Sequence, residues 1–263
     1  MSARTAAPQA AVLTRDLGIA HAGGSRPNDG RAVDGVTITL PRAGALVVMG
    51  PTGSGKSSLL AVLAGDEEGD VAVVGGEGWV HGLSLRKGGR TRRQLTYHVG
   101  YHAQAAGAAL NPRLTVGEII AEPVTSRDRR LNSRALALRS AALLDEVRLP
   151  LGAATKFPYE LSAGMRQRVA FARALVLQPA VLVADEPFAN LDPEVRPAVL
   201  DAIERRREAY GMSAVIGTND RDVAAALRAD VLVLQHGHPV AQGPHDSIRW
   251  SLSAEAETRF VVS

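Results

Sequence analysis

The chain has 263 residues, of which 46% are hydrophobic and 22% charged, and it contains no cysteine. This is the composition of a globular protein, and it excludes collagen-like, coiled-coil and disordered chains as well as disulfide frameworks and thiolate metal sites. The net charge of +3 is too small to favour a nucleic-acid partner by itself. No stretch approaches the roughly 18 apolar residues of a membrane-spanning helix, and the first ten residues lack the apolar core of a secretory signal. We therefore expect one large α/β domain, or two small ones, in a reducing cytosol.

The N-terminal part of the chain shows the two-residue period of strands. After a loose tail over residues 1–10, apolar and polar residues alternate over 11–19 and 33–40, with a turn-rich loop over 22–30 between them. Val36, Ile38 and Leu40 fall on one face of the second segment, as in a half-buried strand. Residues 45–49 are all apolar, which is typical of a strand buried on both faces.

Helices and strands alternate along the rest of the chain. Apolar residues recur at helical spacing over 129–147, and Pro150 ends that segment. Strands are expected over 181–184, 213–217 and 231–234, and helices over 195–209 and 221–227. Together with a helix-rich middle at roughly 110–175, this order predicts a mostly parallel sheet with a helical insertion.

A phosphate-binding loop follows the strand at 45–49. The segment Gly50-Pro-Thr-Gly-Ser-Gly-Lys-Ser57 has the G-x-x-x-x-G-K-[ST] spacing, and a helical run begins directly after it. Glycines let the backbone turn so tightly that successive N–H groups face one anion, and the positive end of the helix adds to the attraction. Lys56 is expected to reach the outer phosphates, and the Ser57 hydroxyl is suited to bind Mg²⁺. The expected ATP-binding residues of this loop are Gly50, Pro51, Thr52, Gly53, Ser54, Gly55, Lys56, Ser57 and Ser58.

Two adjacent carboxylates end the strand expected at 181–184. A parallel strand ending beside the phosphate loop brings Asp185 near the metal, directly or through water, and lets Glu186 polarise the attacking water. In isolation, such a pair also occurs as an ordinary acidic turn at a strand end. In combination with the phosphate loop, the pair indicates nucleotide hydrolysis.

A third motif, Leu161-Ser-Ala-Gly-Met-Arg-Gln-Arg-Val169, opens a helix that continues through Leu175. With it, the sequence resembles the ATP-binding-cassette (ABC) ATPases, whose signature is Leu-Ser-Gly-Gly-Gln or a near variant followed by Arg-Gln-Arg. The resemblance covers roughly residues 11–245 and rests on the order of phosphate loop, signature and Asp-Glu-Pro segment. It implies an α/β P-loop NTPase fold of the ABC type, in which a mostly parallel core sheet carries an antiparallel β subdomain and a helical subdomain at roughly 110–175. Residues 246–263 are expected to form a C-terminal tail.

The resemblance also implies a head-to-tail dimer of cassettes that sandwiches two ATP molecules. In such a dimer Ser162 and the N–H of Gly164 bind the γ-phosphate held by the partner's phosphate loop, and Asp192 lies in the loop that communicates across the dimer. Gln104 matches the glutamine that senses Mg²⁺ and contacts the membrane subunit, although an ordinary polar residue at a strand end is the alternative. The implied signature residues are Leu161, Ser162, Ala163, Gly164 and Met165, and the implied metal ligands are Ser57, Gln104 and Asp185.

Three positions depart from the family pattern. Asn219 stands where a switch histidine is usual. Its amide can donate a hydrogen bond to phosphate, but it cannot take up a proton or carry a positive charge. We therefore expect slower hydrolysis or its loss. Ala163 replaces a glycine, which costs about 1 kcal/mol or more unless φ is negative there. His21 stands where an aromatic residue usually stacks on adenine, and it is equally well a loop histidine. Since each site of a heterodimer carries only one of the first two departures, a heterodimer is favoured over a homodimer.

The segment Ala109-Leu-Asn-Pro-Arg-Leu-Thr-Val-Gly-Glu-Ile-Ile120 resembles the peptide, nickel and oligopeptide importers, although the Cys-bearing C-terminal extension of their longer members is missing. This branch implies integral-membrane permease subunits on separate chains, a second ABC ATPase subunit and an extracytoplasmic solute-binding protein. It also implies a place on the cytoplasmic face of the cell membrane. ATP and Mg²⁺ are the expected cofactors.

Three functions are compatible with these motifs. The first is the ATP-hydrolysing subunit of a transporter, with Glu186 and Asn219 as the catalytic residues. The second is a degenerate cassette that binds ATP as a regulatory or structural subunit, which Asn219 favours and Glu186 opposes. The third, an ABC ATPase of DNA repair or translation, usually needs large insertions or two cassettes in one chain. Basic clusters at 86–93 and 205–207 are interpreted as solvated faces, so no nucleic acid is expected. The motifs do not distinguish import from export.

Overall fold

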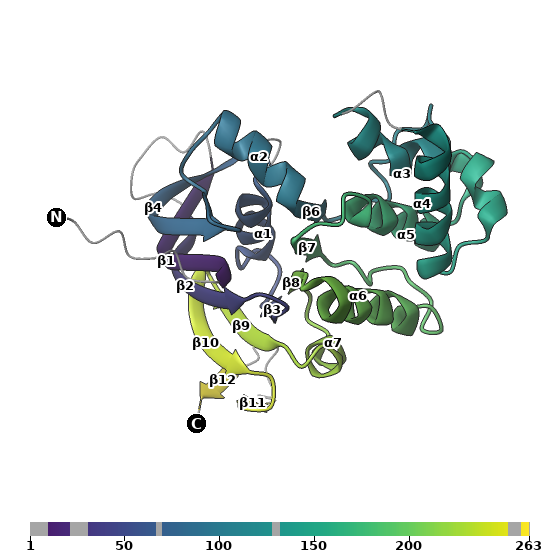
Figure 1. The fold of residues 1–263 in the computed structure, drawn as a ribbon. Helices are drawn as coiled ribbons and strands as arrows, with labels where there is room; N and C mark the ends of the chain where they lie inside the picture. The colour runs from purple at the N-terminus through teal and green to yellow at the C-terminus, as the bar shows by residue number, and fades with distance from the viewer. Residues whose placement is uncertain (1–9, 22–30, 67–69, 128–131, 252–258, 263) are drawn as a thin grey trace.

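The computed structural model describes residues 10–21, 31–66, 70–127, 132–251 and 259–262. Within them the chain forms two large sheets, a two-stranded sheet near the C-terminus and a cluster of helices (Figure 1). The N-terminal tail up to residue 9, the loop expected at 22–30 and the start of the helical pattern at 129–131 lie outside the described residues.

The first sheet is antiparallel. Its order is β2-β1-β4-β5, with β1 at Ala10–His21, β2 at Arg31–Pro41, β4 at Val71–Val80 and β5 at Leu83–Ser84. Val36, Ile38 and Leu40 are buried on one face of β2, as the alternation predicted. Glycines interrupt the alternation in β4, which is why the sequence did not reveal that strand. At Gly76 φ is +60° and a Cβ would lie 2.0 Å from the carbonyl oxygen of Asp16, so only glycine allows the irregular pairing of β4 with β1 there.

The second sheet is mostly parallel, which confirms the predicted fold class. Its order is β10-β9-β3-β8-β7-β6, with β3 at Ala45–Met49, β6 at Val99–His102, β7 at Val181–Asp185, β8 at Ser213–Gly217, β9 at Asp230–Gln235 and β10 at His238–Pro244. Only β10 runs antiparallel to its neighbour. Every residue of β3, β7 and β8 is buried, because both faces of the sheet are covered.

The two faces of the core sheet belong to different apolar clusters. Leu46 and Val48 of β3 pack with the antiparallel sheet and α1, which spans Lys56–Ala64 and lies between the two sheets (Figure 1). Val47 and Met49 face the opposite way, toward the cluster that contains the remaining apolar helices. Six residues of α1 are buried, so the segment that follows the phosphate loop is held from both sides. The outer helices near the sheets are α2 at Arg90–His98, α6 at Arg196–Tyr210 and α7 at Arg221–Ala226.

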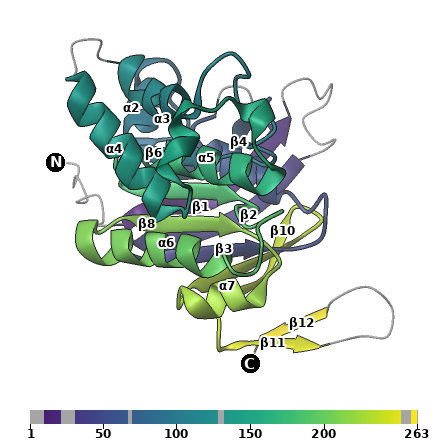
Figure 2. The ribbon, with the colours of Figure 1, turned by 90° about the vertical axis from the view of Figure 1, so that its right-hand side faces the viewer.

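The helix-rich middle of the chain is confirmed and forms a layer beside the core sheet (Figure 2). It contains α3 at Val116–Thr125, α4 at Ser133–Glu146, α5 at Ala163–Leu175 and two short 3₁₀ helices, η1 at Leu151–Thr155 and η2 at Pro158–Glu160. Thr115 and Glu118 form a capping box that starts α3, and the side chain of Asn132 accepts backbone N–H bonds at the start of α4. These caps explain why the helices begin where they do.

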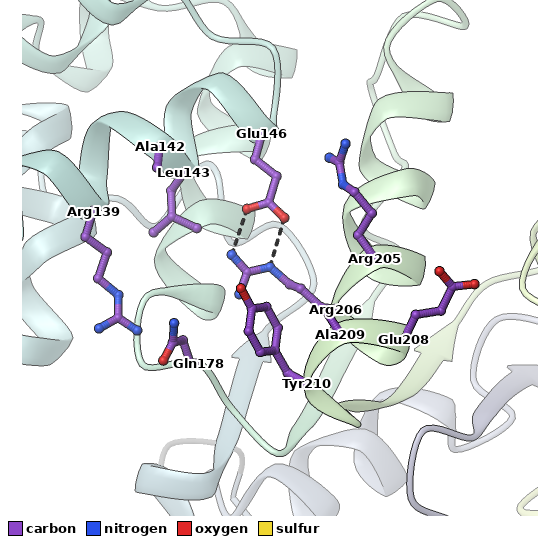
Figure 3. Close-up of a pocket in the computed structure, with 10 residues that line it drawn as sticks. All are labelled: Arg139, Ala142, Leu143, Glu146, Gln178, Arg205, Arg206, Glu208, Ala209 and Tyr210. Atoms are coloured by element: carbon purple, nitrogen blue, oxygen red, sulfur yellow. Dashed lines mark hydrogen bonds and ion pairs between the residues drawn. The ribbon is translucent and has the colours of Figure 1, made fainter.

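An ion pair joins this helical layer to the core. The guanidinium of Arg206 on α6 makes two hydrogen bonds, of 2.9 and 2.7 Å, to the carboxylate of Glu146 at the end of α4. The pair lies in a pocket of about 640 Å³ between the two helices, which Arg139, Gln178 and Tyr210 also line (Figure 3). Both partners are mostly buried, so this bidentate contact fixes α4 against α6.

The C-terminal segment, expected as a tail over 246–263, contains two paired strands. β11 at Ile248–Ser251 and β12 at Arg259–Val262 form an antiparallel pair (Figure 2). Within the described part of the chain, none of the helices has the length and apolar character needed to cross a membrane.

Candidate functional site

The phosphate loop connects β3 to α1, and its glycines have conformations and surroundings that exclude a side chain. Gly50 and Gly55 have φ of +144° and +97°. A Cβ on Gly50 would lie 2.1 Å from the carbonyl oxygen of Leu234, and one on Gly55 would lie 2.2 Å from that of Ala32. The loop is thus pressed between β9 and β2, with its N–H groups and the N-terminus of α1 available to an anion.

Lys56 lies across the start of this loop. Its Nζ donates to the carbonyl oxygens of Gly50, at 2.5 Å, and Pro51, at 3.2 Å. Burial lowers the pKa of Lys56, while the nearby Glu186 and Asp185 raise it. A lysine so placed can exchange its carbonyl contacts for phosphate oxygens.

Asp185 is the last residue of β7, and Glu186 follows it directly. β7 is separated from β3 by β8 rather than being its direct neighbour. Burial raises the pKa of Asp185, whereas a hydrogen bond from the Ser57 hydroxyl and the charge of Lys56 lower it. The second carboxylate oxygen of Asp185, Oδ2, is buried without a hydrogen-bond partner. A buried carboxylate with an open oxygen beside a serine hydroxyl fits a hard divalent cation.

Glu186 has an unusual backbone for a residue other than glycine, with φ of +46°. Its N–H donates to the carbonyl oxygen of Gly217 at 2.8 Å. Burial raises the pKa of its carboxyl group, and a hydrogen bond from the Thr218 side chain is the larger of the opposing effects. Sequence reasoning assigned no role to Thr218, and its only signal was its place beside Asn219.

Asn219 is brought to the phosphate loop by β8. The strand pairs with β3, and the Thr218 N–H donates to the carbonyl oxygen of Val48 at 3.1 Å. One residue further, the side-chain oxygen of Asn219 accepts a hydrogen bond of 2.9 Å from the N–H of Gly50. The structure therefore brings Lys56, Asp185, Glu186 and Asn219 together around one loop.

Gln104 and His21 are exposed at strand ends. Gln104 follows β6 by two residues, and no hydrogen bond among the described residues joins it to Ser57 or Asp185. His21 is the last residue of β1, and the loop that continues from it lies outside the described residues. Their roles as metal ligand and adenine-stacking residue stay predictions.

The signature residues form the start of α5. The Ser162 side chain caps the helix by accepting a hydrogen bond of 3.2 Å from the N–H of Met165. Ala163 is the first helical residue and has a negative φ, so its methyl group causes none of the strain considered for a positive φ. A Cβ on Gly164 would lie 2.7 Å from the carbonyl oxygen of Asn190, so glycine is needed where α5 approaches that loop. Asp192 is exposed in the same loop.

None of the described hydrogen bonds or ion pairs joins the signature, residues 161–165, to the phosphate loop of the same chain. Leu161 is buried, whereas Ser162 and Ala163 are exposed. The start of α5 is consequently a second exposed surface, separate from the phosphate loop, with a helix N-terminus and the capping hydroxyl of Ser162.

Sequence reasoning missed a buried polar pair near the site. The ring Nε2 of His102 lies 2.8 Å from Nε2 of Gln167, and both side chains are buried. Burial lowers the pKa of His102 to about 4, so the ring is neutral at pH 7. A histidine among the apolar residues of a buried strand was the only sequence signal for this pair.

Comparison with known proteins agrees with this architecture. A sequence model of the family described as ABC transporter matches residues 33–189. The peptidoglycan transport ATP-binding protein YejF of Agrobacterium fabrum is 36% identical over 217 residues, which make up 81% of this chain and 38% of that protein. The oligopeptide transport ATP-binding protein OppF of Salmonella typhimurium is 32% identical over 222 residues, which make up 84% of this chain and 66% of that protein.

Solved structures show the same fold. The ATP-binding cassette MJ0796, in a dimeric post-hydrolysis state bound to ADP and Pi, superposes with a TM-score of 0.78 at 23% identity, covering 89% of this chain and 98% of that one. CbiO1 from Clostridium perfringens gives a TM-score of 0.73 at 21% identity, covering 91% and 90% of the two chains.

The fold and the loop define an ATP-binding cassette. The chain belongs to the ABC transporter family. The matched region spans only 38% of the length of the YejF relative.

Proposed function

We propose that this chain binds ATP with Mg²⁺ and hydrolyses it to drive the import of peptides through separate permease subunits. The observation that carries the proposal is the convergence of Lys56, Asp185, Glu186 and Asn219 on one phosphate loop. Such a set supplies a phosphate cradle, a metal ligand, a base and a hydrogen-bond donor in one place.

The chain's own residues perform distinct tasks in this reaction. The loop N–H groups and Lys56 hold the outer phosphates, and Ser57, Asp185 and Gln104 are the residues that would hold Mg²⁺, which offsets the phosphate charge when bound. The Glu186 carboxylate takes a proton from water as the water oxygen bonds to the γ-phosphorus and the bond from that phosphorus to the ADP oxygen breaks. Thr218 restrains the carboxylate through its hydrogen bond.

The second surface of the cassette, the start of α5, is proposed to act on the ATP of a partner cassette. Ser162 and the N–H of Gly164 lie at a helix N-terminus, which favours phosphate binding. Because Asn219 belongs to the chain's own site, we propose a heterodimer in which the partner cassette carries the usual histidine in its own site and compensates for this departure. Asp192 lies in the loop that would face that partner.

The proposed docking site for the permease is the cleft between the core sheet and the helical layer. This cleft has a volume of about 730 Å³ and is lined by β6, the segment that follows it, α3 and α5. Its walls include the apolar Leu110, Leu114 and Ile119 together with an ion pair of 2.7 Å between Glu122 and Arg173. A short amphipathic helix of a membrane subunit fits such a lining. That contact would hold the chain at the cytoplasmic face of the membrane.

Peptides are the proposed solute because several relatives are named as oligopeptide transport proteins, and an extracytoplasmic binding protein would then deliver them. The alternative, a cassette that binds ATP without hydrolysing it, is favoured by one observation, the asparagine at position 219.

The test is ATP hydrolysis by the chain purified together with its permease and partner cassette, compared with the Glu186→Gln variant. We expect turnover to fall at least about 100-fold in the variant, because the proton acceptor is lost. Nucleotide-dependent uptake of labelled peptides into proteoliposomes tests the solute. Equal hydrolysis with and without Glu186, despite tight ATP binding, would support the alternative.

A further inference from the structure

Two buried polar side chains outside the proposed machinery contact each other next to Glu186. His102 ends β6 and has no exposed surface, and Gln167, in the second turn of α5, is 5% exposed. Nε2 of Gln167 lies 2.8 Å from Nε2 of His102 and 3.3 Å from the backbone carbonyl oxygen of Glu186. The Gln167 amide thus bridges a core strand and the residue that would activate water.

The hydrogen-bond roles in this bridge follow from chemistry. A carboxamide NH₂ group has two hydrogens and accepts nothing, so it can serve two acceptors at once. The Glu186 carbonyl is an acceptor, which fixes the NH₂ group rather than the amide oxygen on that side. His102 must then accept through Nε2 and carry its proton on Nδ1. The edge of the Phe171 ring, with its centroid 5.9 Å from that of the imidazole, packs against the histidine.

Glu186 needs such support because of its backbone. Its φ of +46° is a left-handed conformation that residues other than glycine adopt only when their surroundings hold them there. The N–H of Glu186 donates to Gly217, and its carbonyl oxygen accepts from the N–H of Ala189 at 3.1 Å in addition to Gln167. Of these three contacts, only that of Gln167 is made by a side chain.

We propose that His102 and Gln167 are positioning residues that hold the backbone of Glu186 so that its carboxylate faces the phosphate loop. His102 acts through Gln167, by locking the amide with its NH₂ group toward the Glu186 carbonyl. The catalytic part of this inference rests on the proposed hydrolytic function, whereas the structural part does not.

The first arm of the test reads out the backbone without any nucleotide. In protein labelled with ¹⁵N-glutamate, the Glu186 amide signal is assigned by its disappearance in Glu186→Gln. We expect this signal to shift or broaden in Gln167→Met and His102→Leu, which keep the size of the side chains but remove the donor or the acceptor. It should return toward the wild-type position in His102→Gln, which restores an acceptor. Gln94→Met, at an exposed position on α2, is the matched control and should leave the signal in place.

The second arm measures turnover and nucleotide affinity separately. Gln167→Met and His102→Leu should lower kcat about tenfold, because a displaced general base loses its geometry. The Kd for ATP should stay within about twofold, since no loop contact changes, and His102→Gln should recover most of kcat. An unchanged Glu186 signal in Gln167→Met overturns the inference, as does a higher Kd with unchanged kcat. If the wild-type complex hydrolyses no ATP, the proposed function fails. The Glu186 amide signal alone then shows whether His102 and Gln167 hold the Glu186 backbone.

Discussion

The side-chain oxygen of Asn219 accepts a hydrogen bond of 2.9 Å from the N–H of Gly50, the first residue of the phosphate loop. This contact fixes the amide orientation, because only the oxygen can accept. The NH₂ group of Asn219 remains a donor, and under the proposed function its acceptor would be a phosphate oxygen. Under the proposed function, Asn219 would contact the phosphate as a neutral donor, without the charge of an imidazolium.

Replacing Asn219 by histidine is expected to raise ATP hydrolysis. A histidine can accept the Gly50 bond through one ring nitrogen and donate to the γ-phosphate through the other, with a proton available near neutral pH. We expect kcat to increase about tenfold, measured by phosphate release at saturating ATP. Asn219→Asp is the matched control, since it keeps the acceptor but adds negative charge beside phosphate, and its affinity for ATP should fall. A folded Asn219→His variant with unchanged kcat would contradict the role given to this position.

The pH dependence of hydrolysis should report the environment of Glu186. Burial raises the pKa of this carboxyl group above the ordinary glutamate value of about 4.3. Because a general base works only in its deprotonated form, kcat should fall as the pH decreases through that raised pKa, at a higher pH than for an ordinary glutamate. The residual rate of Glu186→Gln should lack this acidic limb. If kcat fell at the same acidic pH in the wild type and in Glu186→Gln, the titrating group would be one other than Glu186.

The fold could be predicted from sequence wherever one physical signal dominated. The apolar runs that form β3, β7 and β8 stood out because strands buried on both faces need such runs. β4 was missed because Gly76, required for the irregular pairing with β1, interrupts its alternation. Residues 246–263 were expected to form a tail without strands. The pairing of β11 with β12 joins two separate segments, and the residue pattern within either segment does not indicate it.

The site residues could likewise be predicted only where a sequence motif marks them. Residues in motifs with fixed spacing, such as Lys56 and Glu186, could be proposed from the sequence because their chemistry dictates that spacing. Thr218 follows β8, Gln167 lies on α5 and His102 on β6, and only the folded chain brings Thr218 and Gln167 to Glu186 and His102 to Gln167. Side chains that support a catalytic group through tertiary contacts carry no local signal in a single sequence.

Removing the charge of Asp185 should stabilise the protein without nucleotide. Burial raises the pKa of this carboxyl group in the folded state, so folding disfavours its ionised form. The stability associated with this group is highest at low pH and is lost as the pH rises through the raised pKa. Asp185→Asn should raise the free energy of unfolding at pH 7 by about 1 kcal/mol, measured by urea denaturation.

The same Asp185→Asn variant should lose the extra stabilisation that Mg²⁺ adds to bound ATP. A neutral amide is a weaker ligand for a hard divalent cation than a carboxylate. Thermal unfolding with ATP alone and with ATP plus Mg²⁺ measures this difference. Equal stabilisation by Mg²⁺ in the variant and the wild type would remove Asp185 from the metal site.

Two glycines of the phosphate loop should respond differently to alanine. Both Gly53 and Gly55 have positive φ, but a Cβ on Gly53 meets nothing within 4 Å, whereas one on Gly55 meets the carbonyl oxygen of Ala32 at 2.2 Å. Gly53→Ala should therefore cost only the conformational strain of about 1 kcal/mol. Gly55→Ala should cost at least about 2 kcal/mol and displace the loop from β2. Unfolding curves and the Kd for ATP measure both effects, and equal losses in the two variants would contradict the packing of the loop on β2.

Restoring the usual glycine at position 163 should not improve the enzyme. Ala163 is exposed and begins α5 with a negative φ, so its methyl group meets no backbone strain. Ala163→Gly should instead lower stability by roughly 0.5 kcal/mol through the greater freedom of glycine in the unfolded chain. Hydrolysis by the assembled complex should stay unchanged. Gly164→Ala is the contrasting variant, because a Cβ there lies 2.7 Å from the carbonyl oxygen of Asn190 and must move α5 or its neighbouring loop. If Ala163→Gly raised turnover while Gly164→Ala had no effect, the methyl group of Ala163 rather than the α5 contact would limit the partner's ATP site.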